Sequence, residues 1–130
     1  MSAVRVGSGT PWEPVVGYSR VVAVDGVAWV SGTTATVGGV VQHPGDLAAQ
    51  TRVALENVAS ALAEVGFSMS DVVRTRLYVT DISRWSEAGR VHGEYFADVR
   101  PATSMVQVAA LIDPDMLIEV EADAVRGAGA

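Results

Sequence analysis

Three acidic side chains alternate along the apolar segment near the C-terminus. Glu119, Glu121 and Asp123 are two residues apart, so in a strand all three project from one face. Carboxylates at this spacing lie about 7 Å apart and repel one another when water is removed. Burial would raise the pKa of one of them, which could then work as a general acid or base. The alternative interpretation is an acidic strand face that remains in water.

Histidine is the other residue type suited to proton transfer near neutral pH, and the chain has two. His92 falls in an apolar helical stripe, where it is either a hydrogen-bonded core residue or a catalytic group. His43 lies in a Gly-rich segment without a partner at metal-ligand spacing. The chain has no cysteine, which excludes a thiol nucleophile and a thiolate metal site. We therefore expect no bound metal. The sequence also contains no phosphate-binding loop motif, so we expect no nucleotide cofactor.

The elements that must position these residues alternate between strands and helices. The β-prone runs 21–24 and 27–30 flank Asp25-Gly26, which is typical of a tight hairpin. Residues 31–45, rich in Gly and Thr, are expected to form a loop. The remaining periodicities predict, in order, a helix over 46–65, a strand over 72–80, a helix from 84 to about 97, and strands over 103–110 and 117–125.

Helices of crossover length between strands predict an α+β domain spanning residues 1–130, with a mixed sheet and two helices packed on one face. We expect the sheet to be six-stranded, and the runs named above supply five of its strands. Asp46 is expected to cap the first helix, whose Arg52 and Glu56 would pair one turn apart. Alternation places Val73, Thr75, Leu77 and Val79 on one face of the strand over 72–80. In the strand over 117–125, it predicts that Ile118, Val120, Ala122 and Ala124 face the core.

Composition excludes several functional classes. The net charge is −6 and the chain contains nine arginines and no lysine, so a surface that neutralises nucleic-acid phosphates is not expected. No apolar stretch is long enough for a signal peptide or a membrane span, which predicts a cytoplasmic protein. Only 18% of the residues are charged, against a usual value of about 25%, which indicates that self-association buries part of the surface.

Short motifs along nearly the whole chain resemble those of the RidA family, also called YjgF/YER057c/UK114. Gly17-Tyr18-Ser19 is similar to its GPYS segment, and Val30-Ser31-Gly32 to its VSG segment. The other matching stretches are Asp46 to Asn57, Asp71 to Thr75, Val79 to Asp81, Gly93 to Phe96, Arg100 to Ala102, Val106 to Leu111 and Ile118 to Ala122.

The resemblance implies a chorismate-mutase-like fold, a homotrimer, and small-molecule pockets in the clefts between subunits. In deaminating members an arginine binds the carboxylate of a 2-imino or 2-enamino acid. A glutamate there positions the attacking water, a role that the resemblance gives to Glu121. The pocket tyrosine and serine correspond to Tyr18 and Ser31. The neighbouring Gly32 and Thr33 could present backbone N–H groups to the ligand.

The chain departs from the family pattern at the substrate-binding arginine, whose position is occupied by Thr103. A hydroxyl offers one neutral donor where a guanidinium offers a charged fork. Gly89 stands where an asparagine is usual, and Met105 where a cysteine is common. Arg20 or Arg100 could reach the pocket instead.

Three functions follow from these residues. The first is an enzyme acting on a small imine, enamine or carbonyl compound, with Glu121 as general acid or base and His92 assisting. The second is a non-catalytic metabolite-binding or chaperone-like trimer. The third is a ribonuclease, which the acidic composition disfavours.

Overall fold

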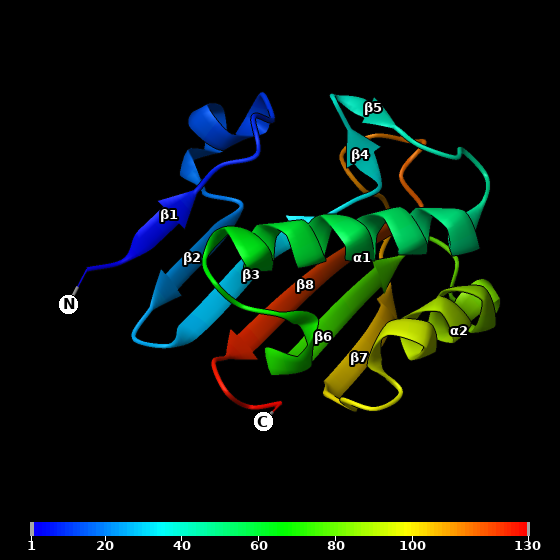
Figure 1. Cartoon of the computed structure of the whole chain (residues 1–130). Helices are drawn as coiled ribbons and strands as arrows, with labels where there is room; N and C mark the ends of the chain where they lie inside the picture. Colours follow the sequence, from blue (N-terminus) through cyan, green and yellow to red (C-terminus); the bar gives the residue numbers. More distant parts are fainter. Residues whose placement is uncertain (1, 130) are drawn as a thin grey trace.

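The computed structural model describes residues 2–129 and contains eight strands and two main helices (Figure 1). Their bounds, in chain order, are β1 (Val4–Val6), β2 (Val21–Val24), β3 (Val27–Thr33), β4 (Thr36–Val37), β5 (Val40–Val41), α1 (Leu47–Glu64), β6 (Val72–Val79), α2 (Trp85–Phe96), β7 (Ala102–Gln107) and β8 (Ile118–Val125). Six of the strands form one sheet in the order β1-β2-β3-β8-β6-β7. Only the β6–β7 pair is parallel, so the sheet is mixed, as expected.

Both helices cover the same face of the sheet, which confirms the predicted α+β architecture (Figure 1). Strand β8 lies in the middle of the sheet, and its four apolar residues from Ile118 to Ala124 are fully buried against the helices. The predicted cap of α1 is present, because Asp46 Oδ1 accepts a hydrogen bond of 3.0 Å from the backbone N–H of Ala49. The carboxylates of β8 consequently lie on the sheet face that the helices leave open.

Helix α2 is fixed to α1 by two polar contacts between their exposed sides. Arg52 pairs with Glu94 of α2, and Glu56 accepts a hydrogen bond from Tyr95 of α2. The predicted pairing of Arg52 with Glu56 is therefore wrong. Helices that pack side by side offer partners across the interface, and the sequence spacing within one helix does not reveal them.

The predicted hairpin at Asp25-Gly26 is confirmed, with left-handed φ angles of 49° and 80° at these residues. The expected loop over 31–45 instead begins with the end of β3 and contains the β4–β5 hairpin. Strand β1 and a π-helical turn at Glu13–Gly17 were not expected from periodicity, because each is too short to show any. Among residues 2–129, no helix is both long and apolar enough to cross a membrane.

Strand β6 departs from its predicted alternation at its first residues. The ladder between β6 and β8 shifts register between Val72 and Arg74, so Val72 is buried whereas Val73 is 39% exposed. The prediction that Val73 shares one face with Thr75, Leu77 and Val79 is therefore wrong. The alternation holds from Thr75 onward, where Thr75, Leu77 and Val79 are fully buried.

Candidate functional site

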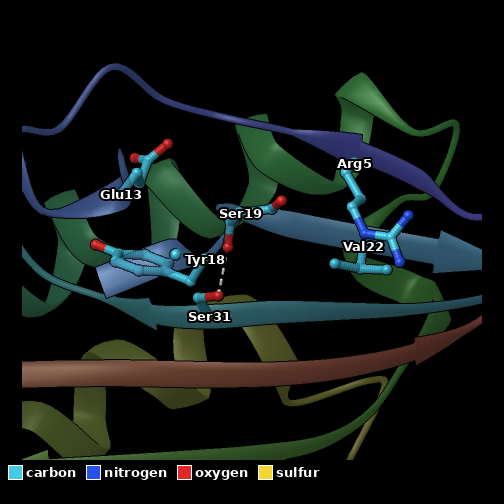
Figure 2. A pocket seen from close by; sticks show the side chains of 7 residues that line it. Arg5, Glu13, Tyr18, Ser19, Val22 and Ser31 are labelled. Atoms are coloured by element: carbon cyan, nitrogen blue, oxygen red, sulfur yellow. Dashed lines mark hydrogen bonds between the residues drawn. The ribbon is translucent and has the colours of Figure 1, made fainter. Parts of the chain in front are cut away.

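A cavity of about 860 Å³ lies at the end of the sheet where the N-terminal segment and the β4–β5 hairpin meet. Its wall includes seven of the residues that sequence reasoning had singled out, namely Tyr18, Arg20, Ser31, Gly32, Thr33, Glu119 and Glu121. A smaller hollow of about 410 Å³ adjoins it and shares Tyr18 and Ser31. Figure 2 shows this hollow, with Tyr18 and Ser31 close together and Arg5 above Val22.

A bulge in β3 shapes the wall of the cavity. The pairing of β3 with β8 is regular up to Val30 and resumes at Thr33, so Ser31 and Gly32 lie outside the regular ladder. Ser31 Oγ donates a hydrogen bond of 2.6 Å to the carbonyl of Ser19 (Figure 2). The carbonyl of Gly32 accepts one of 2.5 Å from Arg20 Nη1. The Ser31 hydroxyl therefore links β3 to the segment directly before β2.

The Arg20 side chain is buried and its donors are occupied. Besides the Gly32 carbonyl, its guanidinium donates to Ser8 Oγ, Thr33 Oγ1 and the Tyr18 hydroxyl. Glu13 lies 3.8 Å from its Nη2. Arg20 therefore reaches the cavity, as one sequence hypothesis allowed, but its hydrogen bonds go to the protein.

Glu13 organises the segment that forms the outer wall. Burial alone would raise the pKa of this carboxyl, but hydrogen bonds from the side chains and backbone of Ser8 and Thr10 outweigh it and lower the pKa to about 2. Sequence reasoning missed this residue. The signal was present, because Thr10-Pro11-Trp12-Glu13 has the spacing of a capping box, in which an acidic side chain returns to the backbone N–H three residues earlier.

The two glutamates of β8 that line the cavity have different surroundings. Glu121 Oε1 accepts a hydrogen bond of 2.6 Å from the Tyr78 hydroxyl, and this bond is the main reason that the pKa of Tyr78 is raised. Glu119 receives no hydrogen bond from any of residues 2–129, and its carboxyl carbon lies only 2.6 Å from the place of a Cβ on Gly32. Burial raises the pKa of Glu119, the charge of Glu121 raises it further, and Arg20 partly opposes both. Of the two β8 glutamates in the cavity, Glu119, which sequence reasoning had only grouped with its neighbours, is the one without a hydrogen-bond donor among residues 2–129.

The third carboxylate of the strand does not line this cavity. Asp123 lies further along β8 and pairs with Arg76 of β6 at 3.4 Å, where the two side chains are partly exposed. The acidic face is therefore divided into an ion pair at one end and two cavity carboxyls at the other.

A second group of predicted residues lies at the edge of the sheet formed by β7. Thr103 on β7 pairs in register with Thr75 on β6, and their hydroxyl oxygens are 2.8 Å apart. Thr75 Oγ1 is also 2.8 Å from His92 Nε2, and Thr103 Oγ1 donates to the Pro101 carbonyl. Each hydroxyl carries one proton, so all three contacts coexist only if His92 Nε2 is the donor. Burial lowers the pKa of His92, which agrees with a neutral ring.

The remaining predicted residues complete this edge without joining the cavity. Arg100 is exposed and has a left-handed φ of 55°, and Met105 packs partly against the core. Within one chain the predicted site is thus split between the β3–β8 cavity and the β7 edge. Among residues 2–129 no three histidine, aspartate or glutamate side chains are grouped to hold a metal ion.

The chain is similar to a known protein family over most of its length. Residues 10–126 match the family model described as Endoribonuclease L-PSP. The 3-aminoacrylate deaminase RutC of Acinetobacter baylyi is 37% identical over 113 residues, which are 86% of this chain and 88% of the relative.

Two solved structures share the fold over nearly their whole length. The crystal structure of Rv2704 from Mycobacterium tuberculosis, a YjgF/YER057c/UK114 family member, is 50% identical with a TM-score of 0.87, over 95% of this chain and 99% of that one. E. coli TdcF with bound serine is 28% identical with a TM-score of 0.78, over 95% and 94% of the two chains. The chain belongs to the YjgF/YER057c/UK114 family, the RidA-like proteins.

Proposed function

We propose that this protein hydrolyses a small imine or enamine, with Glu119 as the group that carries the proton. The observation that supports this role is the environment of the Glu119 carboxyl. It lines the cavity, it has no hydrogen-bond donor within residues 2–129, and burial raises its pKa. A carboxyl with a raised pKa keeps its proton to a higher pH than an ordinary carboxyl, so it can donate that proton and then take one back. The naming of RutC as a 3-aminoacrylate deaminase supports the same class of reaction.

In the proposed reaction, protonated Glu119 gives its proton to the imine nitrogen. The resulting carboxylate takes a proton from water while the water oxygen bonds to the imine carbon, which forms a carbinolamine. The proton then passes to the nitrogen, the carbon–nitrogen bond breaks and ammonia leaves. The hydroxyl proton returns to Glu119 as the carbonyl forms. The net change is one imine and one water converted into one carbonyl compound and one ammonia.

The resemblance to the family had indicated Glu121 for this role, and the hydrogen bond from Tyr78 is the reason to favour Glu119 instead. A carboxylate already accepting a short hydrogen bond is less available to a water or a substrate nitrogen. Under this proposal Glu121 contributes by its charge, which raises the pKa of Glu119.

We further propose that three copies assemble through the open face of the sheet, in the cytoplasm. Trp29 and Val106 lie on this face and are 46% and 48% exposed in the single chain. Covering them is favourable, because burying large apolar side chains removes them from water. The division of the predicted site between the β3–β8 cavity and the β7 edge also supports assembly, since in the proposed trimer a neighbouring chain brings Thr103 and His92 to the cavity.

The proposal is tested by measuring ammonia release from imines that an oxidase generates in situ. Glu119→Gln should lower turnover by roughly a hundredfold or more, the usual contribution of a general acid or base. Glu121→Gln, its matched control two residues away on the same strand face, should cost far less. A larger loss of turnover in Glu121→Gln than in Glu119→Gln would show that Glu121 carries the proton.

Absence of turnover with every imine would instead favour the metabolite-binding alternative. In that case ligands should raise the melting temperature while nothing is converted. The cavity also disfavours a ribonuclease, because the negative charge of the two β8 carboxyls that line it would repel a phosphate group.

A further inference from the structure

The cavity has a polar base and an apolar mouth. Hydroxyl and carboxyl groups from β3 and β8 form the base, where Glu119 lies. Apolar side chains of three separate segments also line the cavity: Trp12 and Val16 from the N-terminal wall, Val37 and Val41 from the β4–β5 hairpin, and Ile112 and the buried Met116 from the segment before β8. The exposed members of this group, Val16, Val37 and Ile112, make up the mouth. Val16, Val37 and Ile112 are 70%, 53% and 65% exposed, so contact with an apolar ligand group would remove them from water.

The charges around the cavity are predominantly negative. Four carboxyls line it, at Glu64, Asp113, Glu119 and Glu121. Arg20 is the one basic side chain among the lining residues that the structure describes, and its donors are bound to protein groups. A cleft lined by one sign of charge concentrates ligands of the opposite sign and disfavours those of the same sign.

We infer that the site takes a ligand that has no carboxylate and carries an apolar substituent. This inference rests on the proposed function and names its substrate class. The substrates are imines derived from amines and from amino-acid amides rather than imines derived from amino acids. The reacting carbon–nitrogen bond meets Glu119 at the base, and the apolar substituent lies at the mouth. In the proposed trimer, the residue that a neighbouring chain brings to the cavity is Thr103, which offers no guanidinium to bind a carboxylate.

The inference can be tested by binding alone, with three unreactive probes that each carry an ammonium group in place of the imine nitrogen. Phenylalaninamide and phenylalanine are matched in size and differ in whether an amide or a carboxylate is present. Alaninamide lacks the phenyl ring. Calorimetric titration should show phenylalaninamide binding at least about tenfold more tightly than either of the others, because one opposed charge or one buried ring is typically worth that much.

Two variants locate the apolar contact. Val16→Ser removes an exposed apolar group from the mouth and should weaken phenylalaninamide several-fold without affecting alaninamide. Val15→Ser is the matched control, because Val15 is in the same π-helical turn, is 85% exposed and does not line the cavity. Equal effects of the two variants would overturn the assignment of the mouth.

Equal binding of phenylalanine and phenylalaninamide would overturn the charge selection, and no binding of any probe at millimolar concentration would overturn the whole inference. These outcomes are separate from those of the proposed function. Selective binding without ammonia release from any imine would leave the ligand class standing and refute only the hydrolysis. Ammonia release with a preference for amino-acid imines would do the opposite.

Discussion

Neutralising Glu13 should destabilise the protein and change how its stability depends on pH. The buried carboxylate accepts hydrogen bonds from Ser8 and Thr10, and its pKa falls from 4.5 to about 2 on folding. This difference corresponds to about 3 kcal/mol of stabilisation, or about 2 kcal/mol after allowance for solvent screening at the surface of the loop. Glu13→Gln should lower the free energy of unfolding at pH 7 by about this amount.

The sign of the pH effect follows from the direction of the shift. Because the folded-state pKa lies below the unfolded value, the stabilisation is complete above about pH 5 and is lost as the pH falls toward 2. Urea unfolding followed by tryptophan fluorescence, at fixed protein concentration, would give the difference between wild type and Glu13→Gln at each pH. That difference should shrink by more than half between pH 7 and pH 3. A difference that stays constant with pH would refute the assignment of a depressed Glu13 pKa.

Two further predictions concern the β7 edge and the open sheet face. The neutral His92 ring should be protonated on Nε2, and its pKa should lie below 6.5; nitrogen NMR measures both. Thr103→Val should change the NMR signals that report the tautomer without unfolding the chain. A ring protonated only on Nδ1 would contradict the hydrogen bonds that link His92, Thr75 and Thr103. Trp29→Glu places a carboxylate opposite Asp123 and should lower the mass measured by light scattering to that of a single chain, whereas Val15→Glu should not. An unchanged assembly in Trp29→Glu would exclude this face as the interface.

The sequence was most informative about strand β8. A strand has a side-chain period of two, so the alternation of Ile118 to Asp123 predicted both the buried face and the acidic face. It did not reveal which of the two β8 carboxyls that line the cavity lacks a hydrogen-bond donor among residues 2–129. Tyr78 is in register with Glu119, yet its hydroxyl reaches diagonally to Glu121, and such a contact depends on strand pairing between residues 43 positions apart.

The same limit applies at the other edge of the sheet. The contact between Thr75 and Thr103 exists because β6 and β7 pair in parallel in one particular register, which the spacing of either strand does not specify. The helical stripe predicted that His92 faces the core, and the structure supplies the hydroxyl that it meets there. Short local elements, such as β1 and the β4–β5 hairpin, have too few residues for a period to be recognised.

The bulge at Gly32 has a consequence for the variation that this chain can tolerate. A carbonyl displaced from a sheet ladder needs another donor, and here Arg20 supplies it from the residue directly before β2. Positions 20 and 32 are therefore coupled through a backbone atom that no substitution at position 32 can remove. Relatives that keep the bulge should carry a long hydrogen-bond donor at position 20, whichever ligand they bind. In an alignment, a donor at position 20 would then report the shape of the strand and would carry no information about the substrate.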